Sequence, residues 1–140
     1  MAVPKAVHWN SKSIGDLSQS QVMTALLRRG ARILMPFGDN ARYDLVIEED
    51  ARFVRIQCKT ARIRNGAVVF AVASSQYHRG GKRRDYRGQA DAFGVFCPDN
   101  GCTYIIPAHD LPLAREAKLR LTRPRNSQVK GIRWAAKYEI

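Results

Sequence analysis

The sequence is short of acidic residues and of long apolar runs, and each shortage excludes a class of protein. It has 12 Asp and Glu against 24 Lys and Arg, which gives a net charge of +12. Such a surplus favours a polyanionic partner, above all nucleic acid. No apolar run approaches the roughly 20 residues that a bilayer-spanning helix needs, and the N-terminus lacks a signal-peptide pattern. We therefore expect a cytoplasmic protein that does not associate with membranes.

Cysteine is also scarce. The three cysteines are too few, and odd in number, for a disulfide framework, which fits a reducing compartment. Cys97 and Cys102 flank the turn sequence PDNG and are predicted to face each other across a hairpin. Because two sulfurs without a CxxC spacing make a poor zinc site, small buried apolar residues are the better interpretation of this pair.

The chain of 140 residues shows no repeats and no low-complexity tract, so we expect one domain over 1–140. Within it, residues 1–12 are predicted to form an N-terminal arm and residues 118–140 a basic C-terminal extension. In that extension Trp134 and Tyr138 are four residues apart, as on one face of a helix.

The pattern of apolar residues predicts a helix at 16–29, which begins at a capping box of Ser13 and Asp16 and ends before Gly30. Strand patterns follow at 31–35, 43–48, 53–60, 67–73, 92–97 and 102–106, with a short helix at 108–115. This order predicts an α+β (mixed α/β) fold with a helix packed against a sheet.

The stretch RYDLVIEEDARFVRIQCK places polar residues where strand alternation does not require them. A turn at 49–52 pairs Glu48 with Phe53 and puts Asp44 opposite Gln57. Opposed residues point to the same face, and Lys59 is a diagonal neighbour of Asp44 at roughly 7–8 Å. The hairpin therefore brings together a carboxylate, an amide and an ammonium group, unless the register slips by one residue.

Gln19 is a polar residue on the apolar side of the first predicted helix, because it precedes Val22, Met23 and Leu26 by three, four and seven residues. A buried polar side chain needs a partner. The alternatives are a hydrogen bond in the packing and a position beside Asp44.

The segments GDLSQSQVMTALLRRG, PFGDNARYDLVI and FVRIQCKT, with the closing KGIRWAAKYEI, resemble the PD-(D/E)XK nucleases. The nearest resemblance is to the bacterial branch of homing endonucleases encoded by group I introns. The resemblance implies a restriction-endonuclease-like α-β-β-β-α-β core, with a mixed central sheet and flanking helices. It also implies hydrolysis of DNA phosphodiester bonds that depends on Mg²⁺ or Mn²⁺.

By position in the family motif, Asp44 and a backbone carbonyl near Cys58 would bind the metal, and Lys59 would orient a water or stabilise phosphoryl charge. Gln57 stands where an Asp or Glu is usual, a departure for which this branch is known. Gln19 stands where the first helix usually has Glu. The alternatives are an ordinary strand-end Asp44, a solvated Lys59 and a cross-strand hydrogen bond of Gln57.

The two glutamines leave Asp44 as the only carboxylate of this group, so magnesium affinity should be weakened. Three explanations stay open: a natural variant that binds metal weakly, a substitution that traps the substrate complex, and a protein that binds DNA without cutting it.

The segment YHRGGKRRDYRG is the predicted DNA-contacting element, because its cations can neutralise phosphates and its glycines let the backbone approach them. Its cations are Arg79, Lys82, Arg83, Arg84 and Arg87. A merely solvated charged face is the alternative. A second contact is expected from the basic tail, with Arg120, Arg123, Arg125, Lys130 and Arg133.

Three functions are compatible with these features. The first is a site-specific homing endonuclease acting on double-stranded DNA as a homo-oligomer, a dimer or tetramer, because one active site cuts one strand. The second is a nuclease of the Holliday-junction-resolving or restriction type. The third is a catalytically inactive DNA-binding module.

Overall fold

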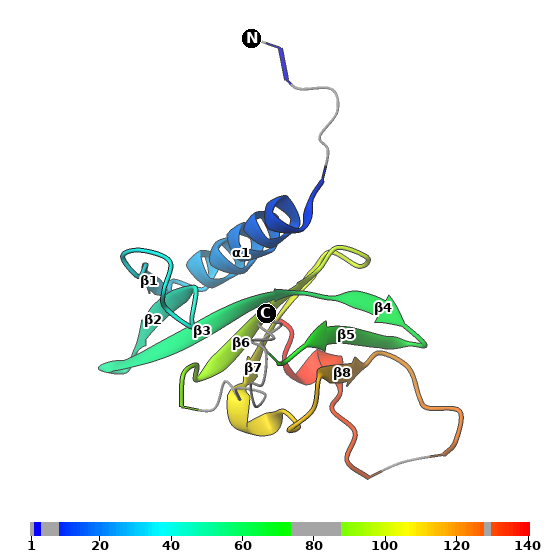
Figure 1. Cartoon of the computed structure of the whole chain (residues 1–140). Helices are drawn as coiled ribbons and strands as arrows, with labels where there is room; N and C mark the ends of the chain where they lie inside the picture. The colour runs from blue at the N-terminus through cyan, green and yellow to red at the C-terminus, as the bar shows by residue number, and fades with distance from the viewer. Residues whose placement is uncertain (1, 4–8, 74–87, 128–129) are drawn as a thin grey trace, which may run out of the picture.

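The computed structural model describes residues 2–3, 9–73, 88–127 and 130–140. In this part of the chain one α-helix, α1 (Ser11–Arg28), lies on a five-stranded sheet (Figure 1). The strands of this sheet are, in spatial order, β1 (Arg32–Leu34), β2 (Leu45–Glu49), β3 (Arg52–Thr60), β6 (Ala92–Cys97) and β7 (Cys102–Pro107). A second sheet of three strands contains β4 (Arg62–Arg64), β5 (Ala67–Ala71) and β8 (Glu116–Arg120).

The five-stranded sheet is mixed, because β3 and β6 run parallel while its other neighbours are antiparallel. This arrangement confirms the predicted α+β class and the mixed central sheet of the restriction-endonuclease-like fold, although the described residues contain one α-helix and not the several flanking helices expected. The predicted register is also confirmed, since Glu48 pairs with Phe53 and Leu45 with Ile56. The connection is tighter than expected: the ladder continues to Glu49 and Arg52, and the turn is Asp50–Ala51 with φ of 45° and 63°. Two positive φ values suit the tight turns that follow the twist of a hairpin.

The two faces of the five-stranded sheet pack against different layers. On β6, Ala92 and Phe96 lie in a core with Val22 of α1. Phe93 and Val95, which alternate with them, lie in the other core, with residues of β5 and β8. A strand buried on both faces is apolar throughout, and this is why β6 shows no polar alternation.

Gly94 permits the close approach of α1 to the sheet. A Cβ at this position would lie 2.6 Å from Val22 Cγ1 and 3.1 Å from Ile56 Cγ2. Because real Cβ contacts are longer, a side chain at Gly94 would push the helix away from β6.

The predicted helices differ from those observed. Asn10, not a box of Ser13 and Asp16, caps α1, since its side chain accepts a 2.9 Å hydrogen bond from the Ser13 backbone N–H. Residues 11 and 12 of the expected arm are therefore helical. The helix expected at 108–115 is only a 3₁₀ turn, η1 (Ala108–Asp110), because Pro112 disfavours helical geometry at the residue before it.

The basic tail was only partly anticipated. It contributes strand β8, which was not predicted, and a 3₁₀ turn, η2 (Ala135–Lys137), instead of a longer helix. Trp134 is 42% exposed whereas Tyr138 is buried, so the two do not share one helical face. The end of the chain lies along β7, with hydrogen bonds from Ile105 N–H to the Tyr138 carbonyl (2.9 Å) and from Ile140 N–H to the Thr103 carbonyl (3.0 Å).

Cys97 and Cys102 are directly paired across β6 and β7, as predicted, and both are free thiols. Within the described ranges, no helix has the length and apolar character needed to cross a bilayer.

Candidate active site

Asp44 is the residue immediately before β2, and β3 holds its side chain in place. Its Oδ2 accepts a hydrogen bond from Gln57 Nε2 at 2.8 Å and another from the Cys58 backbone N–H at 2.7 Å. Its own N–H donates to the Ile56 carbonyl at 2.9 Å. The carboxylate is thus oriented by both the side chain and the backbone of the neighbouring strand.

Gln57 and Lys59 lie on the face of the sheet that is turned away from α1. In the parallel ladder they pair with Phe93 and Val95, whose side chains pack toward the three-stranded sheet. The positive charge of Lys59 acts on Asp44 and favours its ionised form. The structure therefore brings together the carboxylate, the amide and the ammonium group.

Asp44 also lies where the two strands of the hairpin separate. The ladder between β2 and β3 ends at the Leu45–Ile56 pair, while β3 continues to Thr60. In a strand, the N–H and C=O of one residue point to the same edge. Since the Cys58 N–H points to Asp44, the Cys58 carbonyl also faces this edge, which β2 leaves uncovered.

Burial raises the pKa of Asp44 above its ordinary value, and the Cys58 N–H and the charge of Lys59 oppose this effect. The pKa of the Cys58 thiol is also raised strongly by burial and, to a lesser extent, by the charge of Asp44. The thiol packs on the α1 side of the sheet. Because the thiol lies on the opposite face of the sheet from Gln57 and Asp44, Cys58 can offer its carbonyl oxygen, and not its sulfur, to a metal at Asp44.

Gln19 is half-buried on α1. The residue before it, Ser18, is buried and forms a 2.5 Å hydrogen bond with Thr60, where either hydroxyl can be the donor. This contact, which sequence reasoning missed, places this turn of α1 at the end of β3. Because α1 covers the face opposite Lys59, Gln19 can approach Asp44 only around the edge of β3 that β2 leaves uncovered.

The donor atoms here fit a hard dication. In the described ranges no group of three or more His, Cys, Asp or Glu residues is placed to hold a metal. Asp44 and the Cys58 carbonyl nonetheless provide oxygen ligands, and Mg²⁺ commonly binds through only one or two carboxylates while keeping several waters. Gln57 presents its amide nitrogen to Asp44, so its oxygen faces away from this carboxylate.

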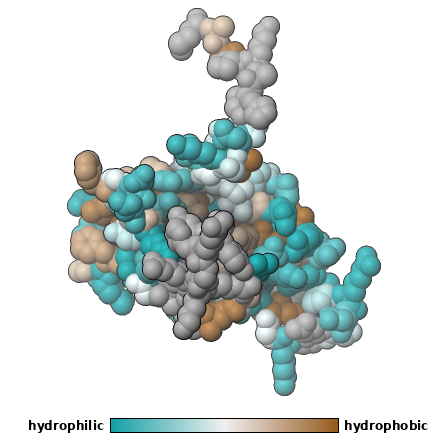
Figure 2. All heavy atoms as spheres, viewed as in Figure 1, coloured by the Kyte–Doolittle hydropathy of each residue, from teal (hydrophilic) through white to brown (hydrophobic). Residues whose placement is uncertain are grey.

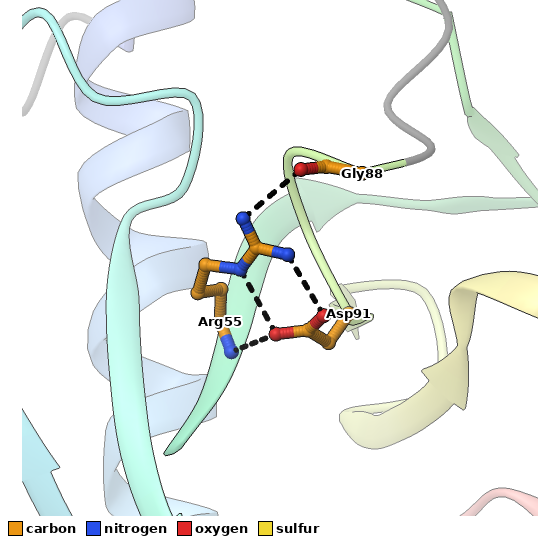
Figure 3. A network of polar contacts seen from close by, with 3 residues as sticks. All are labelled: Arg55, Gly88 and Asp91. Atoms are coloured by element: carbon orange, nitrogen blue, oxygen red, sulfur yellow. Dashed lines mark hydrogen bonds and ion pairs between the residues drawn. The ribbon is translucent and has the colours of Figure 1, made fainter.

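A second polar network ties β3 to the segment before β6 (Figure 3). Arg55 donates to Asp91 Oδ2 from its backbone N–H (2.8 Å) and Nε (3.0 Å), and to Oδ1 from Nη2 (3.0 Å). Its Nη1 donates to the Gly88 carbonyl at 3.0 Å. These bonds lower the pKa of Asp91. With both oxygens engaged, Asp91 serves as a structural anion, and no local pattern pointed to this pair because its residues are 36 positions apart.

The predicted DNA-contacting cations Arg79, Lys82, Arg83, Arg84 and Arg87 lie outside the described residues. What the structure does describe is a carboxylate and an ammonium group close together at a strand edge that β2 does not cover, on a strongly basic chain. This combination suits an enzyme that acts on a polyanion.

The chain belongs to the PD-(D/E)XK endonuclease family, whose family model matches residues 9–140. Among solved structures, it is similar to a bacterial homing endonuclease, I-Ssp6803I, with 22% identity and a TM-score of 0.74 over 94% of this chain and 89% of that one. It is more distantly similar to the Holliday junction resolvase Hjc of Archaeoglobus fulgidus, with 13% identity and a TM-score of 0.47 over 76% of this chain and 83% of that one. None of the curated proteins matches the chain in sequence.

Proposed function

We propose that this endonuclease hydrolyses phosphodiester bonds of double-stranded DNA with Mg²⁺ or Mn²⁺, as a site-specific homing endonuclease. The observation that carries the proposal is the position of Asp44, held by Gln57 and Cys58 beside the charge of Lys59. These are the groups that metal-assisted phosphodiester hydrolysis requires: an anionic ligand and a cation for the charge that develops on the phosphate.

Asp44 and the Cys58 carbonyl would hold the dication, with the amide oxygen of Gln19 as a neutral donor. When bound, a dication polarises the scissile phosphate and acidifies a coordinated water. The Cys58 N–H and the Gln57 amide keep Asp44 oriented. Lys59 stabilises the negative charge of the phosphoryl oxygens or orients the attacking water.

The rest of the proposal concerns the partners. Residues 1–140 act as one nuclease domain, and the basic segment with Arg79, Lys82, Arg83, Arg84 and Arg87 contacts the duplex.

A homo-oligomer, a dimer or tetramer, supplies one active site for each strand. Exposed apolar side chains next to β1 support self-association, since Met35 is 54% exposed and Phe37 107%. A DNA substrate implies an intracellular location.

The test is cleavage of a library of random-sequence duplexes, large enough to contain a recognition site, compared with a four-way junction, by the purified chain and its Asp44→Ala variant in Mg²⁺ and in Mn²⁺. We expect the chain to cut a defined subset of the duplexes and the variant to bind them without cutting. Preferential cutting of the junction would replace homing by junction resolution. Equal loss of cutting and binding in the variant would make Asp44 structural.

One observation favours a second candidate, a DNA-binding module without catalysis. Gln19 and Gln57 are both neutral, so among Asp44, Gln57 and Gln19 only Asp44 would offer a charged ligand to a dication. Duplex binding with no cutting at up to 10-fold excess of protein, in either metal, would support this candidate and contradict the first.

A further inference from the structure

The outer face of the three-stranded sheet carries a basic surface remote from the candidate active site. On β8, Ala117 and Leu119 point into the core, so the alternating residues point outward. The register places Lys118 in one row with Arg62, and Arg120 in one row with Arg64, in each case across β5. Two cations from β4 and two from β8 therefore share this face.

One acidic residue, Glu116, also lies on this outer face, and two arginines of β4 neutralise its charge. Its carboxylate is 2.8 Å from Arg64 Nη2 and 3.8 Å from Arg62 Nη2. Lys118 is exposed and stands on the same strand two residues further on. The face therefore keeps an excess of positive charge toward β8.

A hollow of about 670 Å³ adjoins this face and extends the basic surface. It lies between the turn Asn65–Gly66 and residues 120–126, which include Arg123 and Arg125, and none of the described residues that line it is acidic. Figure 2 shows hydrophilic side chains standing out at this end of the molecule, where the segment after β8 is orange in Figure 1.

The wall of the hollow is preformed. Arg120 donates to the Asn65 carbonyl from Nη1 and to the Thr122 carbonyl from Nε, both at 3.0 Å. The Gly66 carbonyl accepts bonds from the N–H groups of Leu121 (2.9 Å) and Thr122 (3.3 Å). Gly66 has a φ of 72°, and a Cβ there would collide with the Thr122 hydroxyl, so this turn requires glycine. These bonds fix the part of the hollow formed by Arg120, Thr122 and the turn Asn65–Gly66, and a fixed wall reduces the ordering cost of binding.

The surface lies at a distance suited to a duplex. The backbone takes six residue steps from Lys59 to Asn65, which at about 3.3 Å per step is at most about 20 Å. A duplex that rises 3.4 Å per base pair covers this distance in about six base pairs. The three-stranded sheet also packs on the same face of the large sheet as Gln57 and Lys59.

We propose that Lys118, Arg123 and Arg125 form a second binding surface for the phosphates of duplex DNA, several base pairs from the scissile phosphate. The inference rests on the proposed function, since it assumes that DNA lies at Asp44. Guanidinium groups that converge on a hollow without a carboxylate suit the oxygens of phosphate.

The test compares K118Q/R123Q/R125Q with the matched control K12Q/R28Q/R29Q, which removes the same charge from exposed positions on α1 and at its C-cap. Binding to a random-sequence 30-base-pair duplex is measured over a salt series without Mg²⁺, and thermal melts check both folds. Each lost phosphate contact should reduce the slope of log affinity against log salt by about 0.9, so we expect a reduction of up to about 2.7 for the first variant. The control should keep the original slope.

Other outcomes would overturn the inference or the function separately. An unchanged slope in the first variant, or an equal reduction in the control, would contradict the second surface while leaving the endonuclease intact. The same loss on a single-stranded RNA of equal length would assign the surface to polyanions in general and contradict the duplex assignment. No duplex binding by the unmodified chain would contradict the proposed function itself.

Discussion

Asp44 is placed where ionisation is costly. Burial raises its pKa above the ordinary value of about 3.9, against the opposing effects of the Cys58 N–H and Lys59. The folded state therefore binds the proton more tightly than the unfolded state. The contribution of Asp44 to the free energy of unfolding is therefore fully present below the pKa that Asp44 has in the unfolded chain. It is lost as the pH rises through the pKa that Asp44 has in the folded protein. A carboxylate kept at such a cost is typical of a functional site.

Asp44→Asn should raise the thermal stability at pH 7, because it removes a buried charge while the amide oxygen can still accept the Cys58 N–H. We expect an increase in Tm of about 1 to 4 °C that disappears near pH 3, where Asp44 is protonated, together with loss of metal-dependent cleavage. Calorimetry at both pH values and a plasmid cleavage assay measure this. A lower Tm at pH 7 would show that the ionised carboxylate stabilises the fold.

Gln19→Glu should tighten Mg²⁺ or Mn²⁺ binding if residue 19 reaches the uncovered edge of β3. At an effective dielectric of about 20, unit charges about 4 Å apart interact by about 4 kcal/mol, and a dication doubles this before desolvation is subtracted. A net gain of about 1.4 kcal/mol is already tenfold in affinity. We expect at least about tenfold tighter metal binding and faster single-turnover cleavage.

The matched control is Gln21→Glu, which adds the same charge at another half-buried position of α1. Metal titration by calorimetry compares both variants with the unmodified chain. If Gln21→Glu gives an equal gain, the effect is one of net charge, and the role assigned to Gln19 is wrong.

At the scale of elements, β3 and β6 are parallel neighbours that no short hairpin turn joins. The Arg55–Asp91 ion pair links β3 to the residue just before β6 (Figure 3). Both side chains are about one-third exposed or more, so the pair is partly screened by solvent. Its geometry is nonetheless favourable, because two guanidinium nitrogens contact the two carboxylate oxygens.

A double-mutant cycle with Arg55→Ala and Asp91→Ala should give a coupling free energy of about 0.5 to 1 kcal/mol in urea unfolding. The matched pair is Arg32 and Glu48, at 3.7 Å with Arg32 79% exposed, for which we expect a coupling near zero. Equal coupling in the two cycles would mean that the bidentate geometry contributes nothing.

The contact between α1 and the sheet depends on Gly94. Gly94→Ala should lower the free energy of unfolding by about 1 to 3 kcal/mol, since the new methyl group collides with Val22. Combining it with Val22→Ala should cost less than the sum of the two single changes, because the second change makes room for the first. Chemical denaturation of the three variants measures this, and strict additivity would contradict the contact.

At the scale of the whole molecule, the end of the chain completes the fold. Tyr138 is buried in the core between the two sheets, and its hydroxyl donates to Asp110 Oδ2 at 2.9 Å. Arg133 also donates to the Asp110 carbonyl. The tail is therefore part of the core, although its basic composition suggests an appended extension.

Tyr138→Ala should destabilise the protein by about 3 to 5 kcal/mol, the usual cost of removing a buried aromatic ring. Trp134→Ala is the control from the same segment. Because Trp134 is 42% exposed, we expect a loss of about 1 kcal/mol or less. Similar losses in the two variants, measured by urea unfolding, would contradict the different burial of these residues.

The sequence by itself determined the α+β class and the register of the hairpin from Tyr43 to Thr60. Strand alternation and a short turn are local signals, and a slip of one residue would have turned every apolar side chain to the wrong face. The same register brought Asp44 opposite Gln57. The family motif pointed to the chemistry of these residues.

Only the tertiary structure decided which face α1 covers, and with it the route by which Gln19 can approach Asp44. It also decided the contacts between Ser18 and Thr60 and between Arg55 and Asp91, as well as the place of Tyr138 in the core. These contacts join residues far apart in the chain, so no periodicity along the sequence reports them. They form because two sheets and a helix must bury their apolar faces together, and that requirement acts on the folded chain as a whole.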